Sequence, residues 1–281
     1  MAPVTSPAID TRAVDHTDQL VATILTSAIT VAAVLAVLVF CRRRRVTWPL
    51  WLLVSGGATF LCEPLFDHLY GLWFWTRGQT TAITTYGIHI PVWLPIVYVT
   101  YYGAWTTWLV QRWQRGATLR QVAQLFTVSA VIAGLFETLY IQIFHLYLYQ
   151  DTQPLSVSDY PVWLAVVNGV PPFLASIIYV RVIPAVRGWG TVVLLYVVPF
   201  AFAAEFGLGW LYLAARHSGQ HPSKALLTIL ALETTASCFA LVVFAAKLAG
   251  IDRQPVLIAH DRTDVRRRRQ APEGVLRAAD G

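Results

Sequence analysis

Five carboxylic acid side chains lie within the most apolar segments of this 281-residue chain: Glu63, Asp67, Glu137, Glu205 and Glu233. They make up a third of its 15 acidic residues. An ionisable group surrounded by hydrocarbon costs roughly 3 kcal/mol or more, so it usually faces the interior of a helix bundle and takes part in function. These five residues are therefore the first candidates for chemistry.

Carboxyl groups paired in a poorly solvated pocket can divide the work of acid/base catalysis. Burial keeps one group protonated, so that it can donate a proton, while a better solvated group stays ionised and can accept a proton or stabilise a cation. Aromatic faces also stabilise cations. This combination suits acid-catalysed cyclisation, dehydration or hydration of a lipophilic substrate, without a cofactor. The chain contains no GxSxG, P-loop or GxGxxG motif.

The elements that must position these groups are predicted to be transmembrane helices. The chain is 56% hydrophobic and 13% charged, with a mean hydropathy of +0.55, which is typical of a polytopic membrane protein. Seven apolar stretches have the length needed to cross a bilayer. They lie at about 20–40, 48–70, 91–110, 122–147, 161–181, 191–213 and 225–248. We expect an all-α fold with one seven-helix domain, 20–250, in the plasma membrane.

Basic residues alternate between the two sides of these spans. Arginines follow the first, third and fifth spans and the last one, whereas the loops around 71–90, 148–160 and 214–224 carry few basic residues. The positive-inside rule then places the N-terminal segment 1–19 outside and the arginine-rich tail 251–281 in the cytoplasm, where we expect the tail to be disordered. The net charge of +6 follows from this topology. We therefore expect membrane lipid rather than nucleic acid as a partner.

All five carboxyl groups are predicted to lie between mid-membrane and the outer boundary, because a helix rises about 1.5 Å per residue. Glu63 and Asp67 are four residues apart and project from one side of a helix. Pro64 cannot donate to the carbonyl of Phe60, so the helix should bend or open there. Asn168 lies at the same depth.

Polar and aromatic residues near this layer complete the candidate site. Glu63, Asp67 and Glu137 are predicted to be catalytic. The predicted substrate-binding residues are His68, His89, Trp93, Tyr98, Tyr101, Tyr140, His145, Asn168, Glu205 and Glu233. Structural roles remain open for each of them, as protonated carboxyl groups bonded between helices or as side chains at the membrane interface.

No metal ligands and no cofactor are predicted. The histidines are scattered, and the cysteines show no metal-binding spacing. A mixed Glu/His site for a divalent metal remains an alternative. The three cysteines are expected to be free thiols, with a bond between Cys62 and Cys238 as the alternative.

Four segments resemble the AveC-like spirocyclase family, a group of actinobacterial polytopic membrane proteins. They are GGATFLCEPLFDHLYGLWFW (56–75), IPVWLPIVYVTYYGA (90–104), GLFETLYIQIFHLYLY (134–149) and YPVWLAVVNGVPPF (160–173). The family's namesake acts on the spiroketal of a macrolide polyketide. The resemblance implies a membrane fold and spiroketal-type chemistry in secondary metabolism. The site positions that the resemblance implies are Glu63, Pro64, Asp67 and Glu137.

If the resemblance holds, an acid protonates a leaving hydroxyl, an oxocarbenium-like cation forms, and a second hydroxyl adds. Glu63 and Glu137 would be the acid/base pair and Asp67 their electrostatic partner.

The main rival interpretation is a proton-coupled transporter, because carboxylates near mid-membrane and broken helices are typical of carriers. A non-catalytic assembly or lipid-binding protein is a third class. A retinal protein is disfavoured, because Lys224 and Lys247 lie at span ends.

Overall fold

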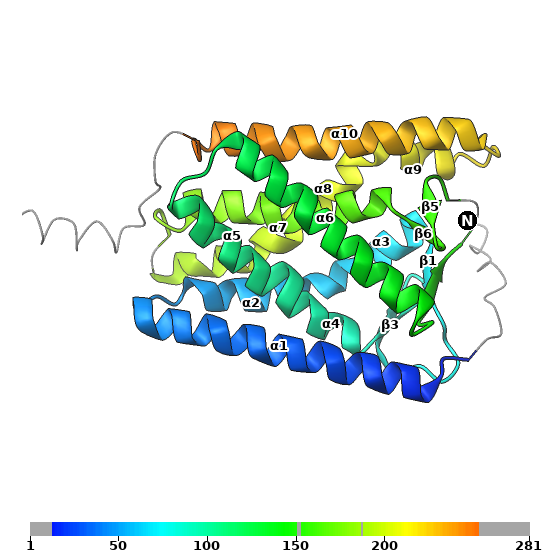
Figure 1. Cartoon of the computed structure of the whole chain (residues 1–281), viewed down its shortest axis with the longest axis horizontal. Helices are drawn as coiled ribbons and strands as arrows, with labels where there is room; N and C mark the ends of the chain where they lie inside the picture. Colours follow the sequence, from blue (N-terminus) through cyan, green and yellow to red (C-terminus); the bar gives the residue numbers. More distant parts are fainter. Residues whose placement is uncertain (1–12, 151–152, 187, 253–281) are drawn as a thin grey trace, which may run out of the picture.

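The computed structural model describes residues 13–150, 153–186 and 188–252. Most of each predicted end segment, 1–12 and 253–281, lies outside the described residues. Within them, six helical segments are long and apolar enough to cross a membrane, and they run roughly along the long axis of the molecule (Figure 1). These segments are His16–Arg44 (α1), Trp48–Tyr70, Leu119–Gln142 (α6), Trp163–Val182 (α7), Gly188–Leu208 and Lys224–Leu248 (α10). The protein is therefore a largely helical membrane protein, as its composition predicts.

Helix α7 lies at the centre of the bundle. It packs against α5 (Trp105–Gln114), α6, α8 (Val197–Leu208) and α10. Short η3 (Gly188–Tyr196) leads into α8, and α9 (Trp210–Arg216) follows α8 after a break at Gly209. The hydroxyl of Tyr70 lies against Gly209, where a β-carbon would collide with it. The same hydroxyl donates to the backbone oxygen of Glu205 (3.0 Å), so this break fixes α8 against the segment that carries Glu63.

The predicted third span, 91–110, is an unbroken helical run of three parts. The parts are α4 (Trp93–Tyr98), a π-helical segment η2 (Val99–Ala104) and α5. A π-helical turn widens the backbone locally and often occurs at functional sites. The run packs against α1, α2 (Trp48–Ala58) and α7, and it presents several tyrosines to the interior.

Two glycines allow α2 and η2 to approach at backbone distance. A β-carbon on Gly103 would lie 2.9 Å from the Cα of Leu53, and one on Gly56 would collide with the backbone of Gly103. Small residues permit such close contacts between helices in membranes. The contact fixes the tyrosine-bearing run beside the segment that continues from α2 to Glu63.

Short antiparallel strands at one end of the bundle were not predicted. Strand β1 (Leu72–Phe74) pairs with β4 (Tyr147–Tyr149), β2 (Thr81–Thr85) with β3 (Ile88–Pro91), and β5 (Ser156–Val157) with β6 (Tyr160–Pro161). They lie near the end where α1 begins, which we call the strand end (Figure 1). The all-α expectation holds for the bundle itself, and these short strands add a folded cover at one end of it.

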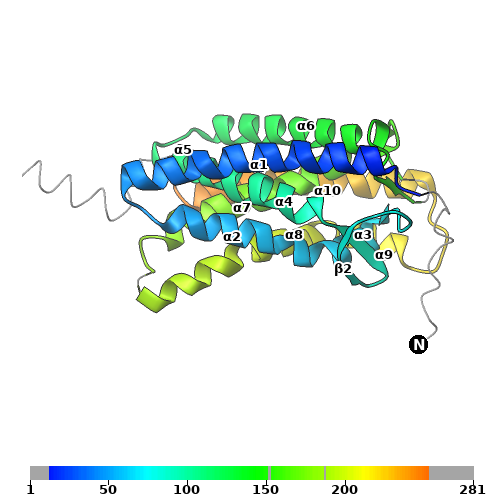
Figure 2. The same ribbon diagram turned by 90° about the horizontal axis from the view of Figure 1, so that it is seen from below.

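The opposite end of the bundle carries most of the arginines that the structure describes, and we call it the arginine end. Arg42–Arg45 lie in the last turn and C-cap of α1 there, Arg112 and Arg115 lie at the end of α5, and Arg181 lies near the end of α7 (Figures 1 and 2). Both views place the ends of α1 and α5 on the same side of the molecule.

Candidate functional site

The helix that carries the first two carboxyl groups changes its geometry before Pro64. Helix α2 passes into a 3₁₀ turn, η1 (Thr59–Cys62), and α3 (Glu63–Tyr70) begins with Glu63. The backbone N–H of Glu63 donates to the carbonyl of Phe60. Pro64 cannot make this bond, because proline has no backbone N–H. The predicted disturbance at this proline is confirmed. Its effect is to place Glu63 in the first turn of a separate short helix.

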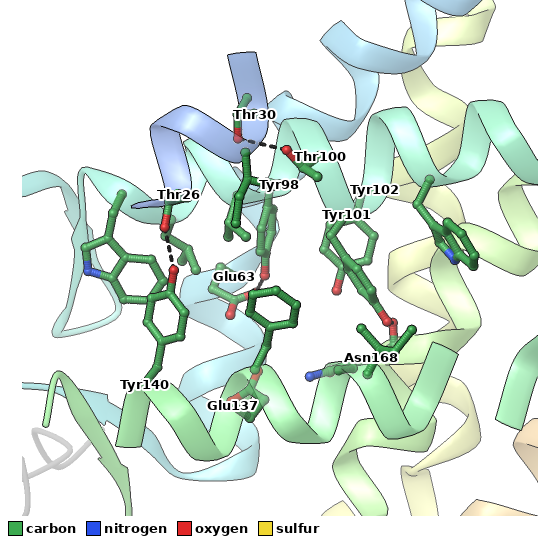
Figure 3. A pocket seen from close by; sticks show the side chains of 18 of the residues that line it. Thr26, Thr30, Glu63, Tyr98, Thr100, Tyr101, Tyr102, Glu137, Tyr140 and Asn168 are labelled. Atoms are coloured by element: carbon green, nitrogen blue, oxygen red, sulfur yellow. Dashed lines mark hydrogen bonds between the residues drawn. The ribbon is translucent and has the colours of Figure 1, made fainter. Parts of the chain in front are cut away.

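A cavity of about 290 Å³ lies between α1, α3, the α4–α5 run, α6 and α7 (Figure 3). Its volume is at the lower end of the range for small-molecule sites, roughly 300–1,000 Å³. Its lining is mostly aromatic and aliphatic. Seven of the predicted site residues line it: Glu63, Trp93, Tyr98, Tyr101, Glu137, Tyr140 and Asn168.

Glu63 is buried at the wall of this cavity, with 6% of its side chain exposed. The hydroxyl of Tyr98, on α4, donates to its Oε2. Asp67 lies one turn further along α3 and is fully buried. It does not line the cavity, so it can act on substrate only through its electrostatic effect on Glu63.

Glu137 reaches the same cavity from α6. Its Oε2 accepts a hydrogen bond of 2.6 Å from the hydroxyl of Tyr147, on β4. Figure 3 shows Glu63 and Glu137 extending towards one space from different helices. Each carboxyl group is thus held by one tyrosine and has its remaining lone pairs available to a ligand.

Aromatic rings from the same helices surround these two groups. Trp93 lies 4.7 Å from Tyr140 between ring centroids, and Tyr98 packs edge-on against Tyr102 at 4.6 Å. Tyr101 packs edge-on against Tyr102 at 4.9 Å, and its hydroxyl donates to the backbone oxygen of Asn168. The cavity therefore combines carboxyl groups, which can exchange protons, with aromatic ring faces, which can stabilise a cation.

Several lining residues were missed by the sequence reasoning. They are Thr26, Thr30, Thr100, Tyr102, Ser129 and Tyr147. Thr26 bonds Tyr140, and Thr30 bonds Thr100 at 2.8 Å. The spacing of Thr26 and Thr30, four residues apart in an apolar helix, is a signal that could have identified them. Tyr147 carried no such signal, because it reaches the cavity through strand pairing.

The remaining predicted residues do not line the cavity. Glu205 is fully buried on α8, and neither of its carboxyl oxygens has a hydrogen-bond partner among the described residues. Glu233 is exposed on α10 and accepts a 2.8 Å bond from Ser237, so the expectation that it faces the interior is wrong. Of the five carboxyl groups predicted to lie at a similar depth, the cavity therefore brings together Glu63 and Glu137.

The three predicted histidines also lie elsewhere. His68 stacks on His217 with ring centroids 6.5 Å apart. His89 pairs with Thr84 in the β2–β3 hairpin, and His145 is exposed, with its Nδ1 3.8 Å from Asp18. All three belong to the strand end or its edge rather than to the cavity.

No group of three or more metal-ligating side chains is found among the described residues. Cys41, Cys62 and Cys238 are free, which excludes the alternative bond between the last two in this structure. The cavity offers carboxyl and phenol groups, which are able to donate and accept protons.

Fold and site together define the class of protein: a helical membrane protein with two carboxyl groups in an aromatic cavity. Comparisons with protein-family models, curated proteins and solved structures find no match to this chain. The resemblance to the AveC-like spirocyclase family therefore stays a prediction from the four sequence segments.

Proposed function

We propose that this protein is a membrane enzyme that cyclises or dehydrates a lipophilic, polyketide- or lipid-like substrate by acid/base catalysis. The observation that carries the proposal is the convergence of Glu63 and Glu137, from α3 and α6, on one aromatic cavity. Each carboxyl group accepts one tyrosine hydroxyl from a neighbouring element and also lines the cavity, so its remaining lone pairs are available to a substrate.

The proposed reaction is the loss of one water from a hydroxy-hemiketal. One carboxyl group donates its proton to the leaving hydroxyl, the C–O bond breaks, and water departs. The resulting oxocarbenium-like cation is stabilised by the other, ionised carboxylate and by the tyrosine and tryptophan faces. A second hydroxyl of the substrate then forms the new C–O bond and gives its proton to that carboxylate. Proton exchange returns both groups to their starting states.

The neighbouring residues have supporting roles in this mechanism. Tyr98 and Tyr147 orient the two carboxyl groups through their hydrogen bonds. Asn168 lies on the far side of the cavity, where its side-chain amide can bond a substrate hydroxyl. Asp67 lies one turn from Glu63 on α3, so a negative charge on one of these two carboxyl groups disfavours a second charge on the other.

Seven spans with an outer N-terminus form the topological part of the proposal. The α4–α5 run, Trp93–Gln114, would be the third span. The grouping of arginines at one end of the bundle supports a cytoplasmic arginine end and an outer strand end. In a bacterial cell this arrangement fits the plasma membrane.

The test compares extractable lipophilic metabolites of the native host with and without this gene, by high-resolution mass spectrometry. Strains restored with the wild type, Glu63→Gln or Glu233→Gln are measured beside them. We expect a precursor one water heavier than its missing product, rescued by the wild type and Glu233→Gln but not by Glu63→Gln. Rescue by Glu63→Gln at normal expression contradicts the proposal.

A proton-coupled transporter is the second candidate, favoured by one observation. The helical segment that carries Glu63 changes from α to 3₁₀ geometry just before it meets the cavity, and interrupted helices at this depth are common in carriers. Reconstituted protein would then move solute in response to a proton gradient. Metabolites of unchanged covalent structure, retained on one side of the membrane in the deletion strain, would favour this function over the enzyme.

A further inference from the structure

The cavity has a side opening between α1 and α6. Three of its lining residues are also exposed on the outside of the molecule: Ile29 of α1 (38%) and Ile132 (42%) and Phe136 (41%) of α6. Deeper lining residues are almost inaccessible, such as Trp93 (3%). Exposure of the same side chains to the cavity and to the surface marks a mouth between these two helices.

The strand end of the cavity is closed. Leu72 and Phe74 of β1 and Tyr147 of β4 line the cavity there and are buried, and the β1–β4 pairing joins their strands. A substrate therefore does not meet an open path from this end. The exposed lining residues lie instead on the side of the cavity between α1 and α6.

This mouth lies at mid-height of both helices. Ile29 lies near the middle of α1, His16–Arg44, and Ile132 near the middle of α6, Leu119–Gln142. With a rise of about 1.5 Å per residue, each is roughly 20 Å from the start of its helix. In a bilayer these positions face the hydrocarbon core, and the three exposed side chains are apolar.

A hydrogen bond joins the two helices at the outer edge of the mouth. Helices α1 and α6 converge towards the strand end in both views (Figures 1 and 2). There the hydroxyls of Thr26 and Tyr140 bond to each other, as Figure 3 shows. On its other side α1 is held by Thr30, which bonds Thr100 and the backbone oxygen of Ile96.

We propose that the gap between α1 and α6 is a lateral portal. Through it, a bilayer-dissolved substrate with an apolar body and a hydroxyl- or ketone-bearing end reaches Glu63 and Glu137. The Thr26–Tyr140 bond limits the width of the portal at its outer edge. The occupant is a lipid-soluble molecule from the membrane, because the mouth is apolar and faces the hydrocarbon. Only the chemistry at the inner end rests on the proposed function, and the access route does not.

The test uses the full chain in phosphatidylcholine vesicles and a hexadecanol that carries a diazirine. Light attaches the probe to nearby residues, and peptide mass spectrometry locates it. Ile29→Trp combined with Ile132→Trp fills the mouth. The matched control is Leu35→Trp with Val128→Trp, two exposed positions on the same helices that do not line the cavity. We expect about tenfold less labelling of Tyr98 and Tyr101 in the mouth variant only.

Equal labelling of these tyrosines in the mouth variant and the control would overturn the portal. A second variant removes only one hydroxyl and leaves the fold intact: Tyr140→Phe releases the outer edge. We expect Tyr140→Phe to be labelled up to about fivefold faster than the wild type, which is the effect of one lost hydrogen bond. An unchanged or slower rate would contradict the role of this bond.

Failure of the portal and failure of the enzyme proposal can be told apart. Glu63→Gln should label like the wild type, because Glu63 lies at the inner end of the path. Normal turnover by Glu63→Gln with portal-dependent labelling would reject the chemistry and keep the access route. If Glu63→Gln lost turnover but the mouth variant were labelled as strongly as its control, only the portal would be rejected.

Discussion

The two carboxyl groups in the cavity differ from the other acidic residues of the predicted spans in what they touch. Glu63 and Glu137 each accept a tyrosine hydroxyl and face the cavity, whereas Glu205 is enclosed by protein and Glu233 faces outward. We therefore expect Glu63→Gln and Glu137→Gln each to lower turnover by about 100-fold or more, the usual contribution of one general acid or base. Turnover of the accumulated precursor by purified protein measures this effect.

Glu233→Gln is the matched control for both variants. It makes the same substitution at an exposed helix position, and we expect turnover within about twofold of the wild type. Equal losses in all three variants would mean that the substitutions act on the membrane fold rather than on the cavity.

Tyr98 is expected to matter through its hydroxyl group alone. Tyr98→Phe keeps the ring packed on Tyr102 but leaves Glu63 without its donor. Losing a hydrogen bond to a buried charged group costs about 1–3 kcal/mol, so turnover should fall by roughly tenfold. Tyr86→Phe, at an exposed turn position of the β2–β3 hairpin, provides the control. An activity of Tyr98→Phe equal to that of this control would show that Glu63 needs no orienting partner.

At the scale of the elements, the glycine contact between α2 and η2 holds the site together. Gly103→Ala would place a methyl group 2.9 Å from the Cα of Leu53, a backbone atom that cannot move independently. Such overpacking costs typically 1–3 kcal/mol, so we expect the midpoint of thermal unfolding in detergent to fall by roughly 3 °C or more. Gly207→Ala in α8 has no neighbour within 4 Å and should leave the midpoint unchanged or slightly higher.

Unchanged unfolding of Gly103→Ala would contradict the backbone contact itself. A loss of turnover larger than the loss of stability would show instead that the contact positions the tyrosine-bearing run against Glu63. The two readouts together separate packing from positioning.

The helices were predictable from the sequence because their apolar runs are long, and the break before Pro64 followed from its missing N–H. The strands were not, since β1 is only three residues long and all three are buried, so no alternation marks it. Tyr147 was not predicted as a site residue because it lies on β4, the equally short strand that pairs with β1. Glu233 was misassigned for another: the buried stripe of α10 runs through Ala231, Thr234 and Cys238, and Glu233 lies about 100° from Thr234 around the helix.

At the scale of the whole molecule, the closed strand end, the arginine end and the side portal define one proposed orientation. The cover formed by β1 and β4 would separate the cavity from the outer aqueous phase, and the arginines would hold the other end at the cytoplasmic surface. A substrate taken from the bilayer would then reach the two carboxyl groups without passing through water. This arrangement suits a reaction that loses water, because a cation formed in the cavity is shielded from bulk solvent.

This orientation predicts opposite labelling of two exposed positions. Tyr86→Cys, on the turn between β2 and β3, should react in intact cells with a membrane-impermeant maleimide. Trp189 lies in η3, after α7, and is 95% exposed; Trp189→Cys should react only after the cells are permeabilised. The wild type gives the background from its own thiols, two of which are buried. Reaction of Trp189→Cys in intact cells, with Tyr86→Cys protected, would show the opposite topology. The arginines would then lie outside, and charge asymmetry would no longer support the proposed orientation.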